Sequence, residues 1–148
     1  MTDQHFKMEK RLMTEAMTCE LPVQEDSLPR RVLVVDDEES IRLLLKEYFE
    51  IVGMQVRVAS SGADGLKALE EGHFGLILCD VSMPGLDGFE VFERVLEMNP
   101  GQKFIFISGY AFAGSRRKLL QKSLGLLHKP FHLEDLNQLL ETLYPDLL

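Results

Sequence analysis

The chain of 148 residues contains no tryptophan and only two cysteines, Cys19 and Cys79. Two cysteines cannot form a disulfide framework, and neither belongs to a Cys-x-x-Cys pair, so the disulfide-framed class is excluded. Cys79 lies inside an apolar run and is interpreted as a small core residue rather than a redox group.

Basic residues are in the minority, because 16 Lys and Arg stand against 24 Asp and Glu for a formal net charge of −8. Such a charge repels polyanions, so we expect no direct binding to nucleic acid. No apolar run approaches the roughly 20 residues of a membrane span, and Met1 to Glu15 lacks the apolar stretch of a signal peptide. We therefore expect a cytoplasmic protein that does not insert into a membrane.

The composition is that of one globular domain, with 45% hydrophobic and 27% charged residues. Residues 1–29 lack continuous apolar runs and contain Pro22 and Pro29, so they are interpreted as an N-terminal extension. The domain itself is expected over residues 30–148. Within the extension, a short amphipathic helix that contacts a partner or a second copy is the alternative to a loosely ordered segment; its apolar stripe would comprise Phe6, Met13 and Met17.

From Arg31 onward, short apolar runs alternate with amphipathic stretches. The runs predict strands over 32–35, 55–59, 74–79, 104–107 and 124–127. Helical spacing predicts helices over 41–52, 63–71, 89–96 and 133–143, while 114–120 predicts only a short, exposed or mobile element. The first, third and fourth strands are apolar at nearly every position, which is typical of burial on both faces of a parallel sheet. The expected fold is an α/β (βα)5 doubly wound parallel sheet.

Polar side chains follow several of these strands at the point where each strand ends. Asp36 and Asp37 follow the first strand, Asp80 the third, Ser108 the fourth and Lys129 the fifth. The carboxyl ends of parallel strands meet at one edge of the sheet, where ligands bind. We therefore expect three aspartates, a hydroxyl and a lysine to lie close together.

Three neighbouring carboxylates repel one another by several kcal/mol at an effective dielectric constant of ~20, so cations are expected among them. Lys129 supplies one positive charge and a divalent ion would supply the remaining two. Oxygen ligands without histidine or cysteine suit Mg²⁺, and Mg²⁺ with a lysine suits phosphoryl transfer. Glu38 and Glu39 are interpreted as first-turn charges of the following helix rather than site residues.

Four motifs in this order resemble the receiver domain of two-component response regulators. They are Val-Leu-Val-Val-Asp-Asp-Glu (32–38), Leu-Cys-Asp-Val-Ser-Met-Pro-Gly-Leu-Asp-Gly (78–88), Ile-Ser-Gly-Tyr-Ala (107–111) and His-Lys-Pro-Phe (128–131). The resemblance covers residues 31–144. It implies a flavodoxin-like sheet with strand order 2-1-3-4-5.

The resemblance also implies roles for the residues at the sheet edge. Asp80 would accept a phosphoryl group from a phosphohistidine on a sensor histidine kinase or a histidine phosphotransfer protein. Lys129 and Ser108 would bind phosphoryl oxygens, and a cis bond before Pro130 would position Lys129. Mg²⁺ would be held by three carboxylates and one backbone carbonyl, those of Asp36, Asp37, Asp80 and Ser82. Phosphorylation would then change the surface of the fourth helix, fifth strand and fifth helix.

Some positions depart from the common receiver pattern. Leu126 stands where receivers usually carry an aromatic residue that turns inward on activation, so the usual aromatic switch is not expected. Tyr110 and Phe112 are candidates to replace it, or are ordinary loop residues. Ser82 and Tyr110 match positions that influence the lifetime of the aspartyl phosphate.

The leading interpretation is a stand-alone receiver that switches a surface for an unidentified downstream protein or relays phosphate, with homodimerisation possible. It would be no enzyme beyond promoting its own phosphorylation and dephosphorylation. One alternative is a receiver-like interaction module that does not use phosphate, suggested by Leu126 and the unusual fourth helix. Another is an Mg²⁺-dependent phosphatase with an aspartyl nucleophile, which would require a second aspartate where Glu38 stands.

Overall fold

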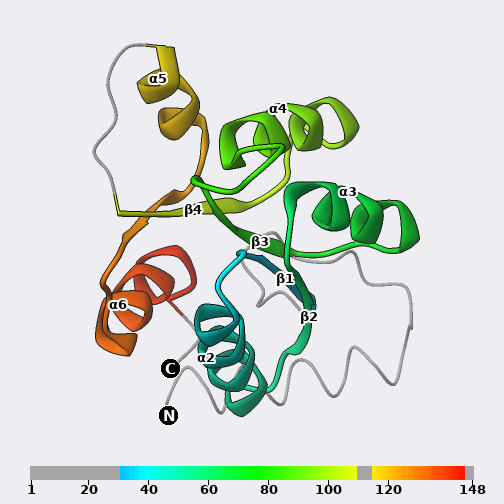
Figure 1. Ribbon diagram of the computed structural model, residues 1–148. Helices are drawn as coiled ribbons and strands as arrows, with labels where there is room; N and C mark the ends of the chain where they lie inside the picture. Colours follow the sequence, from blue (N-terminus) through cyan, green and yellow to red (C-terminus); the bar gives the residue numbers. More distant parts are fainter. Residues whose placement is uncertain (1–30, 110–114, 146–148) are drawn as a thin grey trace, which may run out of the picture.

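The computed structural model describes residues 31–109 and 115–145. Strands and helices alternate along them (Figure 1). The elements are β1 (Arg31–Val35), α2 (Glu39–Ile51), β2 (Gln55–Ala59), α3 (Gly62–Glu71), β3 (Leu76–Asp80), α4 (Gly88–Met98), β4 (Phe104–Ser108), α5 (Ser115–Lys122), β5 (Gly125–His128) and α6 (Leu133–Leu143). The strands form one parallel sheet in the order β2-β1-β3-β4-β5, which confirms the predicted fold.

The sheet lies between two layers of helices. Helices α2 and α6 lie on one face, and α3, α4 and α5 lie on the other (Figure 1). Side chains alternate between the two sides, so Leu33 and Val35 join the core beneath α3 and α4 while Val32 and Val34 join the core beneath α2 and α6. This burial on both faces explains why β1, β3 and β4 are apolar at nearly every position.

Helix α4 is anchored at both its start and its apolar face. The Asp87 carboxylate accepts a hydrogen bond from the Glu90 N–H at 2.9 Å, and the Asp87 N–H donates to Glu90 Oε1 at 3.3 Å. The ring of Phe92 lies 5.1 Å from that of Phe106, and the ring of Phe89 lies 4.8 Å from it. These contacts fix the segment between β3 and α4 relative to the sheet.

The observed strand boundaries differ from the predicted ones. β3 begins at Leu76 rather than Phe74, and β3, β4 and β5 each end one residue later than predicted, at Asp80, Ser108 and His128. The parallel pairing extends to these residues, since Asp80 is paired with Ile107 and Ser108 with His128. Asp80 and Ser108 are therefore held by the sheet itself and not by a loop.

Helix α5 is the short element expected before the fifth strand. It has eight residues, and Arg116, Arg117, Lys118 and Lys122 are all exposed. Leu119 and Leu120 contact the core beneath α3 and α4. Within residues 31–109 and 115–145, no helix is both long and apolar enough to span a bilayer. The predicted helix within 1–29 and the candidate residues Tyr110 and Phe112 lie outside the described residues.

We predict that Gly88→Ala lowers the free energy of unfolding by about 1–3 kcal/mol, because overpacking forces the backbone to shift. A Cβ at Gly88 would lie 2.5 Å from the carbonyl oxygen of Asp80 and 2.9 Å from Cα of Val81. Urea denaturation measures the effect. The control is Gly101→Ala, whose Cβ would meet no atom closer than Asn99 Oδ1 at 3.7 Å. Equal stability of the two variants would contradict this view of the α4 start.

Candidate functional site

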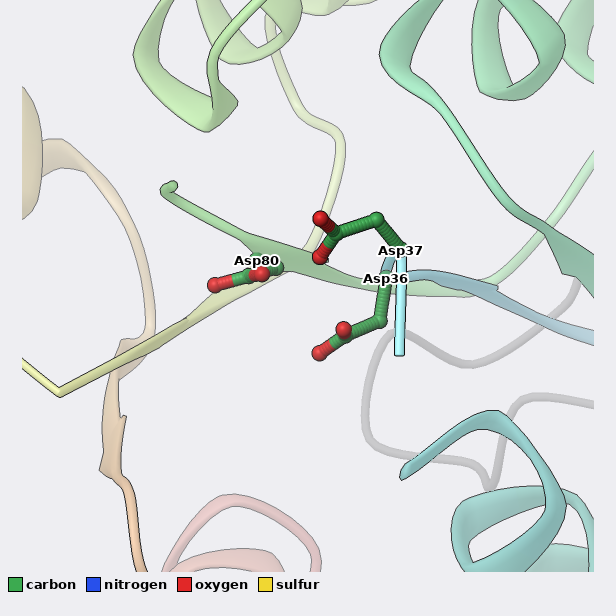
Figure 2. A group of neighbouring side chains, drawn as sticks. All are labelled: Asp36, Asp37 and Asp80. Carbon is green, nitrogen blue, oxygen red and sulfur yellow. The ribbon is translucent and has the colours of Figure 1, made fainter. Parts of the chain in front are cut away.

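Three aspartates converge where β1 and β3 end. Asp36 follows β1 directly and its N–H donates to the Ala59 carbonyl at 3.1 Å, which extends the β1–β2 pairing by one residue. Asp80 is the last residue of β3. Figure 2 shows the carboxylates of Asp36, Asp37 and Asp80 side by side, and one oxygen from each lies within 4.8 Å of the others. We call these three residues the acidic cluster.

The three carboxylates differ in exposure. Asp36 is fully buried and Asp80 is 3% exposed, whereas Asp37 is exposed. Asp36 Oδ1 accepts a hydrogen bond from the Glu38 N–H at 2.8 Å, and Asp80 Oδ1 accepts one from the Ser82 N–H at 3.3 Å. Among the described residues, the buried Asp36 Oδ2 accepts no well-formed hydrogen bond and has only an ion pair with Lys129.

Lys129 follows the edge strand β5, and its side chain reaches the acidic cluster. Its N–H donates to the Ser108 carbonyl at 2.8 Å, which places it directly after β5. Its ammonium nitrogen lies 3.1 Å from Asp36 Oδ2 and 3.4 Å from Asp80 Oδ2. It also lies 2.8 Å from Glu38 Oε1. The bond from Lys129 to Pro130 is cis, as predicted.

The contact with Glu38 adds to the sequence interpretation. Glu38 was expected to act as a helix-terminal charge, and it does occupy the N-cap position of α2, but its side chain makes no capping hydrogen bond. Its carboxylate instead binds Lys129, which is 91 residues away in the chain. The available signal was the run of four consecutive acids from Asp36 to Glu39, which calls for more than one neighbouring cation. Glu39 remains a first-turn acid of α2.

The remaining candidates lie around this centre. Ser108 is fully buried at the end of β4, next to the Lys129 backbone. Ser82 is exposed and contributes its N–H to Asp80. Leu126 is partly buried in β5 and contacts the core beneath α3 and α4. This aliphatic side chain occupies the position at which the sequence predicts no aromatic switch.

Burial and like charge shift the pKa values of the buried groups. Desolvation, followed by the charge of Asp36, raises the pKa of Asp80 to about 6, against the opposing effects of Lys129 and the Ser82 N–H. Burial also raises the pKa of Asp36. Burial alone would lower the pKa of Lys129, but the hydrogen bond to Glu38 and the close Asp36 carboxylate outweigh it and raise this pKa. The site therefore favours the charged form of Lys129 and disfavours the charged forms of Asp36 and Asp80.

These residues fit a hard divalent cation. The donors are all carboxylate oxygens, they come from two adjacent strand ends, and the buried Asp36 Oδ2 has acceptor capacity left over. Such a donor set suits Mg²⁺, which binds one or two carboxylates and retains several waters. Asp36, Asp37 and Asp80 would hold the ion, and its charge would relieve the repulsion that raises the pKa of Asp80.

Known proteins with similar sequences share this domain. A sequence profile of the response regulator receiver domain matches residues 32–141. The response regulator receiver protein CpdR of Brucella abortus is 35% identical over 108 residues, which cover 72% of this chain and 90% of CpdR. The sensor kinase CckA of the same organism is 36% identical over 108 residues, which cover 71% of this chain but 11% of the kinase. This chain thus spans about a tenth of the kinases it matches.

Solved structures agree in fold. A CheY-like receiver domain protein from Methanospirillum hungatei superposes with a TM-score of 0.72 at 30% identity, covering 82% of this chain and 97% of that protein. The response regulator TrrA of Thermotoga maritima, solved in complex with Mg²⁺ and beryllofluoride, gives a TM-score of 0.69 at 30% identity. That match covers 77% of this chain and 98% of TrrA.

We predict that Asp80→Asn stabilises the metal-free protein at pH 7.5 by about 1–3 kcal/mol. The ordinary pKa of 3.8 rises to about 6 in the folded state, so folding favours the protonated carboxyl. That contribution is complete below pH 3.8 and is lost as the pH rises through about 6. The advantage of the uncharged asparagine should therefore grow between these values and stay constant above them.

Urea denaturation across this pH range measures the difference. Asp64→Asn, at an exposed position in the first turn of α3, is the control and should not stabilise the protein at pH 7.5. Destabilisation by Asp80→Asn at pH 7.5 would show that the buried carboxylate is not a source of strain.

Proposed function

The chain belongs to the response regulator receiver domain family, whose members are phosphoacceptors in two-component signalling, and we propose that Asp80 carries the phosphoryl group. The observation that supports this assignment is the position of its carboxylate. It is nearly buried at the end of β3, beside two further aspartates and 3.4 Å from the Lys129 ammonium. Of the two buried aspartates, Asp80 is the one on the central strand, between Asp36 after β1 and Ser108 on β4.

In the proposed reaction, a carboxylate oxygen of Asp80 attacks the phosphorus of a phosphohistidine. A phosphorus–oxygen bond forms and the phosphorus–nitrogen bond breaks, and the imidazole nitrogen leaves with the electron pair. Bound Mg²⁺ would neutralise phosphoryl oxygens during this transfer. Lys129 binds one phosphoryl oxygen and the Ser108 hydroxyl donates to another. The domain acts on its own aspartate and at most promotes its own phosphorylation and dephosphorylation.

Phosphorylation turns the Asp80 monoanion into roughly a dianion with additional acceptor oxygens. Converting a mostly inactive population into a mostly active one takes ~5 kcal/mol, which a few charge-assisted hydrogen bonds can supply. Ser108 and Lys129 lie at the ends of the elements that lead to α5 and α6. We propose that the surface formed by α5, β5 and α6 changes in response.

Helix α5 contacts the start of α4, and these contacts indicate how phosphorylation could change this surface. Arg116 Nη1 lies 3.3 Å from Asp87 Oδ2, and its guanidinium lies 5.0 Å from the centre of the Phe89 ring. These contacts hold the start of α5 against the start of α4. We propose that these contacts break when Ser108 moves toward a phosphoryl group. Since Leu126 cannot act as an aromatic switch, we assign the transmission to α5.

The proposed phosphodonor is a sensor histidine kinase or a histidine phosphotransfer protein, as the similarity to the receiver parts of sensor kinases supports. The net charge of −8 favours a downstream protein, or a second copy of this chain, over nucleic acid. We place the protein in the cytoplasm, where such kinases present their phosphohistidine.

The two alternative functions are not favoured. A module that does not use phosphate would not need the acidic cluster and Lys129, which come together here. A phosphatase with an aspartyl nucleophile would need an aspartate where Glu38 stands.

We predict that acetyl phosphate with Mg²⁺ adds one phosphoryl group to the protein and that Asp80→Asn abolishes the addition. Intact-protein mass spectrometry measures it, with and without a chelator, and the chelator should prevent the reaction. The matched control Asp64→Asn removes an exposed carboxylate from α3 and should react like the unaltered protein. Phosphorylation of the Asp80→Asn variant at the same rate would refute the assignment.

We predict that Lys129→Ala leaves the fold and some phosphorylation intact but prevents the response of β5 and α6. The lysine is the described cation that contacts both Asp36 and Asp80, so without it the phosphoryl group loses its connection to the end of β5. Backbone NMR shifts of β5 and α6 on adding Mg²⁺ and beryllofluoride provide the measurement. Lys46→Ala, which removes an exposed ion pair with Glu50, should retain the full response. A full response in Lys129→Ala would contradict the proposed role.

A further inference from the structure

Lys129 has a third carboxylate partner outside the acidic cluster. Its distance to Glu38 Oε1 is 2.8 Å, shorter than its distances of 3.1 Å to Asp36 and 3.4 Å to Asp80. The Glu38 side chain is 55% exposed and that of Lys129 is 16% exposed. Glu38 therefore approaches the ammonium from the solvent side, while the two aspartates approach it from the protein interior.

The backbone around Glu38 is fixed, so its side chain is well placed for this contact. The Glu38 N–H donates to Asp36 Oδ1 at 2.8 Å, and Arg42 of α2 donates to the Asp36 carbonyl at 2.8 Å. The Glu38 carboxylate makes no capping hydrogen bond in α2. Its contact within the described residues is the ion pair with Lys129.

An ammonium group has three hydrogen atoms to donate, and three carboxylates surround that of Lys129. Phosphorylation converts the Asp80 carboxylate into an acyl phosphate, so its phosphoryl oxygens must compete with Glu38 and Asp36 for the Lys129 ammonium. Displacing the exposed partner, Glu38, costs the least free energy, because exposed ion pairs contribute only about 0.2–1 kcal/mol to stability. Its negative charge also repels an anionic phosphodonor that approaches from solvent.

We propose that Glu38 is a positioning residue that restrains Lys129 in the unphosphorylated protein and competes with the phosphoryl group for it. The proposal rests on the function assigned above. Glu38 lowers the affinity of the site for a phosphoryl group, and it binds Lys129 again when the phosphoryl group leaves. It thus sets the balance between the unphosphorylated and phosphorylated states.

The test compares Glu38→Gln with Glu39→Gln. Both variants remove one negative charge near the start of α2, but Glu39 forms no ion pair within the described part of the chain, so only Glu38→Gln releases Lys129. The probe is beryllofluoride with saturating Mg²⁺, titrated by NMR. We expect Glu38→Gln to bind it about 1.4- to fivefold more tightly than Glu39→Gln, which is the fold-change of a pair worth 0.2–1 kcal/mol.

A double-mutant comparison separates restraint of the lysine from a structural effect. In the Lys129→Ala background, Glu38→Gln and Glu39→Gln should have equal beryllofluoride affinity, whereas a merely structural role of Glu38 would preserve the difference. Equal affinity of the two variants in the unaltered background, with normal binding by the parent protein, overturns the Glu38 proposal alone. Failure of the parent protein to bind beryllofluoride overturns the assigned function and, with it, this inference.

Discussion

The ion pairs of one lysine with carboxylates from the ends of two strands are the interaction on which the site depends. Asp36 and Asp80 are buried and their pKa values are raised, so the fold holds their charges at an energetic cost. Lys129 offsets part of this cost at distances of 3.1 and 3.4 Å. It cannot neutralise the whole acidic cluster, and the remaining negative charge suits a divalent cation.

The sheet provides the rigidity that such a charge arrangement requires. Asp80 and Ser108 lie within the hydrogen-bonded pairing of β3, β4 and β5, and the Lys129 N–H extends that pairing by one bond. A group that repels its neighbours can be held close to them only if the backbone does not yield. The helices matter for the same reason, because α4 is capped at Asp87 and approaches the Asp80 carbonyl at Gly88, where a side chain would not fit.

Much of this arrangement could be predicted from the sequence because it follows from local patterns. Continuous apolar runs indicated β1, β3 and β4, and the rule that parallel strands present their carboxyl ends at one edge brought Asp36, Asp80 and Lys129 together. The order of the strands followed from the resemblance to receiver domains. Glu38 could not be assigned this way, because its helix-start position has an ordinary explanation and its partner is 91 residues away. The strand ends were also missed by one residue, since Asp80 and Ser108 are polar yet remain paired in the sheet.

The most direct test of this account is the number of protons released when Mg²⁺ binds. A carboxyl of Asp80 with a pKa of about 6 is roughly half protonated at pH 6 and ionised at pH 8, so Mg²⁺ must displace a proton only at the lower pH. Calorimetry in buffers of different ionisation enthalpy measures this release. The account predicts clear proton release at pH 6 and much less at pH 8. Binding with no release at either pH, or no binding at all, would contradict it.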